Sequence, residues 1–268
     1  FLKNKDNIEI ISNVFILGSS SVNNYYRNLI TFLPRIFFNH NNHIKLAIHR
    51  NSSNKFRNFL LKICRRLKIK VQIVFLDNDI YFYKNSLIPQ FMNKKNSIKV
   101  LNNLTKNSYK EKSNLKLYII RNNASFRNIF NEWDVTQKLK KNGFLIVDPN
   151  ELEIWKQIEL FSNAKVVISA AGSGLANIVF CPPKTKVFEI SPIYKHEYEK
   201  VFQSRYKNIC QILNFKYYSV AADSIEVDAS KTSANKIISS KVLKQSNYYK
   251  NLLLKLENID EILNIIDT

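Results

Sequence analysis

The second half of the sequence alternates short apolar runs with amphipathic helical patterns. The apolar runs, which are rich in β-branched residues, occupy residues 115–120, 144–147, 165–169 and 187–190. Helical spacing of apolar residues separates these runs, near residues 130–141, 153–162 and 174–180. Strands that alternate with helices of this length form a parallel sheet with right-handed crossovers. The pattern therefore predicts an α/β fold.

The first half shows a similar but less regular alternation. Residues 8–18 predict a strand, and Asn23 is placed to cap a helix that runs to Phe38. The nearly continuous β-branched and aromatic run from Val71 to Leu76 is typical of a strand that is covered on both faces. Further elements are expected as strands at residues 45–49 and 80–83 and as a helix that Ser52 or Ser53 caps.

A polar stretch without periodicity separates the two halves. Residues 107–114, NSYKEKSN, have no apolar repeat, and we place the linker there. The sequence thus predicts two α/β domains, residues 1–108 and 109–240. A C-terminal segment, residues 241–268, is expected to pack back across the domains as an amphipathic helix from Tyr248 to Ile266.

The chain carries a formal net charge of +20. A strong positive field concentrates anionic partners such as nucleic acids, acidic glycans and membrane headgroups. Lys, Asn and Ile are abundant throughout, whereas the chain has four glycines and six prolines, which indicates that much of the charge follows genome composition. Because no RNP, zinc-finger or helix-turn-helix pattern is present, no nucleic-acid partner is predicted. Peripheral contact with an acidic membrane surface stays open.

No apolar run is long enough to span a bilayer, and the first residues lack the order of a signal peptide. The three cysteines have neither metal-ligand spacing nor the pattern of a disulfide framework, which favours buried packing roles in a reducing compartment. We therefore expect a cytoplasmic protein, with peripheral contact at the inner face of the membrane as an open alternative. Because the sequence opens on Phe1, we interpret it as part of a longer polypeptide.

Two of the four glycines lie in AAGSGLAN, residues 170–177, directly after a predicted strand. In a chain so poor in glycine, Gly172 and Gly174 are expected to mark positions that need a positive φ angle or a close backbone approach. A strand, a tight turn and a helix N-terminus present free N–H groups that suit a diphosphate. The alternative is a close helix–sheet contact. The lysine of a Walker loop and the glycine spacing of a dinucleotide fingerprint are both missing.

Two arginines follow the strand at 115–120 in the segment RNNASFRNIFNE, residues 121–132. The forked guanidinium groups of Arg121 and Arg127 can reach one anionic group from this strand end, and the alternative is a solvated pair. We expect Arg127→Ala to abolish binding of a nucleoside diphosphate and to leave the melting temperature nearly unchanged. Glu132, at a helix start, is a candidate for chemistry or for capping.

A third cluster lies in the first half, at another predicted junction between a strand and a helix. Its segment NNYYR contains Asn24, Tyr26 and Arg27, and LPR at residues 33–35 follows. We expect an acceptor to enter beside this junction, across a cleft from the second domain.

In order and spacing, these elements resemble glycosyltransferase family 61. The shared elements are Arg121, Ala124, Arg127, Asn131, Glu132, Gly143-Phe144, Gln157, Phe161, Ala164, Gly172 to Asn177, Phe180, Pro182 and Val187 to Ile190. They cover about 75 contiguous residues. The first half resembles the family more weakly, through Asn24-Tyr25-Tyr26 and Leu33-Pro34-Arg35.

The resemblance implies a GT-B-like architecture, in which two Rossmann-like domains with parallel sheets face a central cleft. It also implies metal-independent, inverting transfer from a nucleoside diphosphate sugar to a glycan or glycolipid acceptor, with no cofactor, as in bacterial capsule or polysaccharide synthesis. The residues expected to bind the donor diphosphate are Arg121, Arg127, Gly172, Ser173, Gly174 and Asn177. Supporting roles are expected for Asn131, Gln157 and Glu189.

Two positions depart from the family pattern. The family commonly has a histidine before the Gly-x-Gly turn and another after the Asn-Tyr-Tyr segment, where this chain has Ala171 and Arg27. An alternative is therefore a catalytically impaired domain that binds nucleotide or glycan. Candidates for a catalytic role are Asn24, Tyr26, Arg27 and Glu132, and the sequence does not identify the base for the acceptor hydroxyl. Surface or packing roles are expected for His40, His43, His49 and His196.

Overall fold

The computed structural model describes residues 8–18, 24–77, 79–109, 113–121, 124–194, 197–225 and 246–268. The chain divides into two compact units, Phe1–Val100 and Leu101–Thr268, and each combines helices with parallel-rich sheets. The α/β class is thus confirmed. The predicted domain boundaries at residues 108 and 240 and the GT-B-like arrangement stay predictions.

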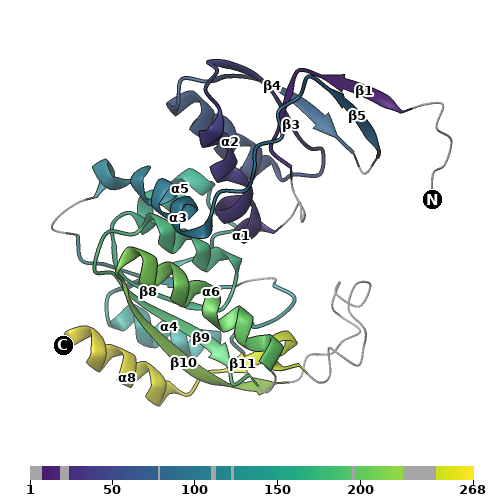
Figure 1. Ribbon diagram of the computed structural model, residues 1–268. Helices are drawn as coiled ribbons and strands as arrows, with labels where there is room; N and C mark the ends of the chain where they lie inside the picture. The colour runs from purple at the N-terminus through teal and green to yellow at the C-terminus, as the bar shows by residue number, and fades with distance from the viewer. Residues whose placement is uncertain are drawn as a thin grey trace. The chain divides into compact units, whose positions relative to one another are not determined.

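The first unit contains two small parallel sheets (Figure 1). One has the strand order β2-β3-β4, with β2 at Val14–Ile16, β3 at His43–His49 and β4 at Lys70–Leu76. The other pairs β1, Glu9–Ser12, with β5, Tyr81–Lys84. The predicted strand at 8–18 is therefore two strands, because Asn13 has a φ of 57° and turns the chain from one sheet to the other.

Two further predictions for this unit need correction. Strand β4 is not covered on both faces, because it is the last strand of its sheet and Phe75 is 37% exposed. The helix that ends at Phe38 begins at Tyr25 and changes type, from α1, Tyr25–Arg27, to a π segment and then to a 3₁₀ segment, Leu33–Phe38. Pro34 has no N–H to donate, so a regular α-helix cannot continue there.

The caps of these helices come from short polar side chains. The Oδ1 atom of Asn24 accepts a hydrogen bond from the Arg27 N–H at 3.0 Å, whereas Asn23 lies outside the described residues. Ser53 caps α2, Asn54–Arg66, as predicted. A further helix, α3, spans Lys94–Asn103, and a 3₁₀ turn follows at Lys106–Ser108.

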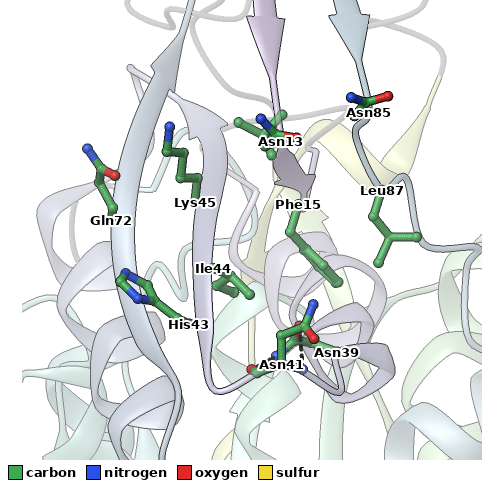
Figure 2. A pocket seen from close by; sticks show the side chains of 11 residues that line it. Asn13, Phe15, Asn39, Asn41, His43, Ile44, Lys45, Gln72, Asn85 and Leu87 are labelled. Carbon is green, nitrogen blue, oxygen red and sulfur yellow. Dashed lines mark hydrogen bonds between the residues drawn. The ribbon is translucent and has the colours of Figure 1, made fainter.

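A cavity of about 470 Å³ opens beside β2, β3 and β4 (Figure 2). Phe15 and Leu87 form part of its wall, and amide side chains predominate around them. Its lining residues are Asn13, Val14, Phe15, Asn39, Asn41, His43, Ile44, Lys45, Gln72, Asn85 and Leu87. None of them belongs to a predicted site.

The second unit is built on a six-stranded sheet with the order β11-β10-β9-β8-β6-β7 (Figure 1). All neighbours pair in parallel except β11, which is antiparallel to β10 at the edge. The strands are β6, Leu115–Ile119; β7, Phe144–Val147; β8, Ala164–Ala170; β9, Lys186–Pro192; β10, Lys216–Ile225; and β11, Asn251–Leu253. The four strands predicted in this half are confirmed, and β10 and β11 extend the sheet beyond them.

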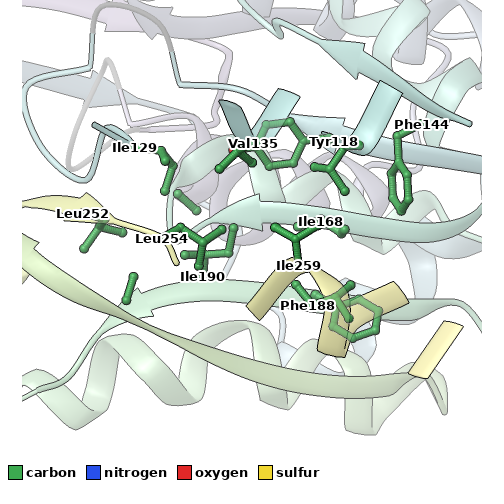
Figure 3. Close-up of a cluster of buried hydrophobic side chains, with 14 of the residues drawn as sticks. Tyr118, Ile129, Val135, Phe144, Ile168, Phe188, Ile190, Leu252, Leu254 and Ile259 are labelled. Carbon is green, nitrogen blue, oxygen red and sulfur yellow. The ribbon is translucent and has the colours of Figure 1, made fainter. Parts of the chain in front are cut away.

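Helices cover both faces of this sheet. On one face, Tyr118, Ile168 and Phe188 form a hydrophobic core with side chains of α4, Glu132–Lys141, and α8, Leu256–Asp267 (Figure 3). Val167 and Val187 point to the opposite face, because side chains alternate along a strand, and they are equally buried. The elements packed on that side are α5, Ile154–Phe161, the 3₁₀ helix η5, Ser173–Phe180, and α6, Glu197–Leu213.

The C-terminal helix is shorter than predicted. Helix α8 begins at Leu256, and the chain before it forms a 3₁₀ turn, Asn247–Tyr249, and strand β11. Leu252 exchanges backbone hydrogen bonds with Asn128 and Phe130 at 2.9 and 2.7 Å. This pairing with a distant segment overrides the helical spacing of the leucines, because intrinsic propensity is a weak preference.

None of the helices in the described ranges is both long enough and apolar enough to cross a membrane. The three cysteines are buried and unpaired, in agreement with their expected packing role.

Candidate active site in the second unit

Arg121 and the Gly172–Gly174 turn, which were predicted to bind the donor, lie at the carboxyl ends of the adjacent strands β6 and β8. Strand β6 lies between β7 and β8, so the chain leaves β6 toward one side of the sheet and leaves β8 toward the other. Arg121 follows β6, and the turn from Ala171 to Gly174 follows β8. Open α/β sheets bind ligands at such a switch point, outside the carboxyl ends of the strands.

The guanidinium group of Arg121 lies directly against Gly172. A Cβ atom on Gly172 would overlap Nη1 of Arg121 and stand 2.6 Å from its Cζ. Nη2 donates a hydrogen bond to the carbonyl of Phe126 at 3.0 Å, whereas Nε is buried and has no hydrogen-bond partner among the described residues. No carboxylate in those ranges forms a salt bridge with this group. Arg121 is therefore a half-buried cation at the switch point, and its buried Nε is a donor without a partner among the described residues.

Burial also changes the electrostatics of Arg121. It lowers the pKa of the guanidinium to about 10, and the nearby charge of Arg127 acts in the same direction. The group still carries a full positive charge at neutral pH. The charge of Glu132 acts in the opposite direction, but no salt bridge joins the two side chains in the described chain, so an anion at this position would gain a charge-assisted hydrogen bond.

Two backbone donors follow Gly172 in the chain. The N–H groups of Ser173 and Gly174 begin helix η5, and neither has an acceptor within the part of the chain that the structure describes. Gly172 is extended, with a φ of −177°, so of the two expected reasons for a glycine a positive φ does not apply, whereas the guanidinium group of Arg121 approaches it closely. Free N–H groups at a helix start favour anions.

Arg127 connects three segments of the unit. Its Nε donates to the carbonyl of Ala171 at 2.7 Å and its Nη1 to the carbonyl of Tyr248 at 2.8 Å. The guanidinium carbon also lies 4.0 Å from the centre of the Tyr248 ring. Arg127 thus fixes the turn after β8 to the segment before β11, and its predicted contact with the diphosphate stays a prediction.

The family follows from the sequence as a whole. The family model described as Glycosyltransferase 61 matches residues 16–188, which is well over half of the chain. The chain belongs to glycosyltransferase family 61. Membership implies glycosyltransferase activity, with a sugar donor and a glycan acceptor, and it confirms the family that the motifs resemble. The bacterial capsule-type subgroup stays a prediction. No curated protein matches the chain.

Three asparagine and glutamine residues of the family 61 motif form hydrogen bonds that fix nearby backbone segments. Asn177 donates from Nδ2 to Oε1 of Gln157 at 2.7 Å, and Gln157 donates in turn to the carbonyls of Pro149 and Leu152. Asn131 bonds to both the N–H and the carbonyl of Leu254, at 3.2 and 2.7 Å. These amides fix the loops around the switch point.

Glu132 lies in the first turn of α4, and its Oε1 accepts a hydrogen bond from the fully buried hydroxyl group of Tyr118. Burial raises the pKa of Glu132, while the hydrogen bond from Tyr118 and the charge of Arg121 oppose that rise. The side chain connects α4 to the sheet beneath the site.

Glu189 lies in the middle of β9 and is fully buried. Its Oε2 accepts a hydrogen bond from Tyr217 at 2.7 Å, and its Oε1 is buried without a partner in the described chain. Burial raises the pKa of this carboxyl group to about 8, against the effects of Tyr217, Arg127 and Arg205. Glu189 is therefore mostly protonated at neutral pH. The family match ends one residue before it.

Three tyrosines that the sequence motifs did not predict lie near the site. The hydroxyl group of Tyr206, on α6, donates to the carbonyl of Gly172 at 2.5 Å, and Tyr248 lies under Arg127. The hydroxyl group of Tyr194 is buried and has no partner in the described chain. These residues come from segments with no motif of their own, so only the fold brings them to the switch point.

Three candidates for a catalytic role lie in the first unit. Asn24 caps α1, Tyr26 is buried and Arg27 is exposed. Arg35 is buried and bonds to the carbonyls of Leu17 and Pro89. The histidines lie elsewhere: His43 lines the cavity of Figure 2, His49 accepts from the Asn51 N–H, and His196 lies outside the described residues. In the described ranges, no three His, Cys, Asp or Glu side chains gather as a metal site.

Proposed function

We propose that this family 61 member transfers a sugar from a nucleoside diphosphate sugar to a glycan or glycolipid acceptor. The observation that carries the proposal is the guanidinium group of Arg121 against Gly172. Among the described residues its buried Nε has no partner, and the N–H groups of Ser173 and Gly174, which follow Gly172 in the chain, have no acceptor. Negative charge builds on the diphosphate as the bond to the sugar breaks. Donors that are fixed in advance stabilise that charge without reorganisation.

Each group has a separate part in this proposal. Arg121 and the start of η5 bind the diphosphate, and Arg127 and Tyr206 act as positioning residues through the carbonyls of Ala171 and Gly172. The buried acid Glu189 supports the floor of the site. The transfer proceeds with inversion and without a metal, in a GT-B-like arrangement of the two units. This arrangement is supported by the family and by the α/β fold of each unit.

Catalytic roles are proposed among Asn24, Tyr26, Arg27 and Glu132. Glu132 is the one carboxylate of the four, and burial raises its pKa in the direction that suits a base near neutral pH. The setting that we propose is glycan synthesis at the cytoplasmic face of a membrane.

A thermal-shift panel of nucleoside diphosphate sugars tests the ligand class. The full chain should be stabilised by at least one donor of the panel, and the same donor should release nucleoside diphosphate when glycan acceptors are added. Stabilisation by NAD and by none of the sugar nucleotides would overturn the proposal.

A second candidate is a domain that binds nucleotide or glycan without turnover. Ala171 favours it, because its methyl group is buried at the position where the family commonly has a histidine. Stabilisation by a sugar nucleotide with no release of nucleoside diphosphate, over a broad set of acceptors, would favour this candidate.

A further inference from the structure

The positive charge is concentrated in the first unit. Residues 10–76 contain eleven lysines and arginines and no aspartate or glutamate. At the average density of acidic residues in the chain, a stretch of this length would carry about five. Genome composition acts on the whole chain, so it does not account for an acid-free stretch in one unit.

Helix α2 displays part of this charge on its exposed side. Phe56, Leu60 and Ile63 face the core, whereas Lys62, Arg65 and Arg66 are exposed. Lys68 and Lys70 follow, also exposed. None of these cations forms a salt bridge with an acid in the described part of the chain. They are therefore available to an anionic surface.

Strands β1 and β5 lie side by side as a two-stranded ribbon (Figure 1), and one face of this ribbon carries exposed apolar side chains. Ile10 pairs with Phe82 across the two strands, and these side chains are 66% and 58% exposed. Ile8 and Ile80 continue the face and are exposed as well. On the other face of the ribbon, Ile11 and its neighbours pack into a hydrophobic cluster of the unit. The ribbon therefore packs against the unit with one face, and the apolar side chains of its other face are exposed.

Cations adjoin the ribbon. Lys84 follows Phe82 on the same face, since side chains alternate along β5. Strand β4 leads into β5, and the guanidinium groups of Arg50 and Arg57 lie over the exposed ring of Phe75 on β4, at 5.6 and 5.2 Å. The acids of this region are Asp77, paired with Arg50, Asp79 in the connecting turn, and Glu9 on the opposite side of β1.

We propose that the first unit docks on a bilayer that contains anionic lipids, with Ile10 and Phe82 inserted at the interface and the cations of α2 against the headgroups. Surfaces that combine apolar side chains with lysine and arginine bind membrane interfaces, and each cation near an anionic surface adds to the attraction. A nucleic acid or an acidic glycan would leave the apolar face uncovered. A second protein copy would bring the cations together, at an electrostatic cost. This docking does not depend on the proposed donor site.

Vesicle co-sedimentation of the full chain tests the proposal. The probes are phosphatidylcholine vesicles with and without phosphatidylglycerol. The test variants are Ile10→Thr with Phe82→Thr, which keeps β propensity, and Arg65→Gln with Arg66→Gln. Matched controls in the second unit are Leu145→Thr, an exposed leucine on strand β7, and Lys140→Gln with Lys141→Gln, two exposed lysines on a helix.

The native chain should prefer the anionic vesicles and should be released by salt. The arginine pair should lower partitioning by about thirtyfold at low salt, and the ribbon pair by about tenfold, while both controls partition like the native chain. If the ribbon pair destabilises the fold, Phe82→Trp provides a second measurement, because its added emission should shift to the blue with anionic vesicles only.

Three results would overturn the proposal. One is equal partitioning to neutral and anionic vesicles. Another is a ribbon variant that converts a dimer into a monomer in sedimentation velocity and leaves vesicle binding unchanged. The third is binding of RNA or heparin by a chain that none of the vesicles retains.

Discussion

At the residue scale, the contact between Arg121 and Gly172 defines the site. The guanidinium group occupies the space that any larger residue at position 172 would need. Glycine is required there for space, whereas its conformational freedom is not used, because the backbone is extended.

Gly172→Ala should therefore act through Arg121. The added methyl group displaces the guanidinium group, so nucleoside diphosphate affinity should fall about as far as in Arg121→Ala. In an Arg121→Ala background the same change should have little further effect, because the two changes remove one interaction. Calorimetric titration of the native chain, the two single variants and the double variant measures this double-mutant cycle. Additive losses of affinity in the double variant would contradict the account.

Gly174→Ala, whose Cβ would stand 3.4 Å from Pro149, should leave the melting temperature within a few degrees.

Glu189 should make stability depend on pH. Its pKa is about 8 in the folded chain, against an ordinary value of 4.5, so the folded state keeps a proton that the unfolded state releases. The stability from this group is complete below pH 4.5 and is lost as pH rises to about 8, at about 1.4 kcal/mol per pH unit. Glu189→Gln should remove this slope in denaturant unfolding at pH 5, 6.5 and 8. Glu151→Gln, at an exposed position, should keep it, and equal slopes in all three proteins would refute the assignment.

The position of a residue in the fold can be predicted from the sequence where its motif directly follows a predicted strand. Arg121 and Gly172 could be placed together because parallel strands bring their carboxyl ends to one edge of a sheet. Tyr206 and Tyr194 could not, because their contacts depend on how α6 and the loop after β9 pack. The burial that raises the pKa of Glu189 likewise comes from tertiary structure.

At the element scale, Arg127 joins segments that are far apart in the sequence. Its removal costs two hydrogen bonds to carbonyls and the contact with the Tyr248 ring. We therefore correct the expectation that Arg127→Ala leaves the melting temperature nearly unchanged. The loss should be about 3 kcal/mol, or roughly 5–10 °C.

Differential scanning calorimetry measures this loss. Arg66→Ala, at an exposed position on α2, is the matched control and should melt like the native chain. If Arg127→Ala melts with the control and has lost nucleoside diphosphate binding, Arg127 contacts the ligand directly and the structural role assigned here is wrong.

Sequence patterns located most elements but not their limits. The strand at 8–18 and the helix from Tyr248 failed where the backbone pairs with distant residues, at Asn13 and at Leu252. The pattern of apolar residues indicates a strand at β4, but it does not show that this strand is at the edge of its sheet.

At the scale of the whole molecule, the strand order places the site. A sheet in which β7 and β8 flank β6 has one switch point, and the motif residues Arg121 and Gly172 meet at that point. The alternation of strands and helices predicts such a sheet, whereas the edge strands β10 and β11 depend on long-range pairing. The uneven charge of the first unit is visible in the sequence, but its combination with the apolar ribbon is visible only in the fold.

Calorimetric titration of nucleoside diphosphates tests the central claim most directly. The native full chain, with a chelator present, should bind one member of a UDP, GDP, CDP and TDP panel at one site per chain. Arg121→Gln should weaken that binding by about tenfold to a hundredfold, because a charged donor is lost, while Arg66→Gln binds like the native chain. Binding of no nucleoside diphosphate, or native affinity in Arg121→Gln, would contradict the account.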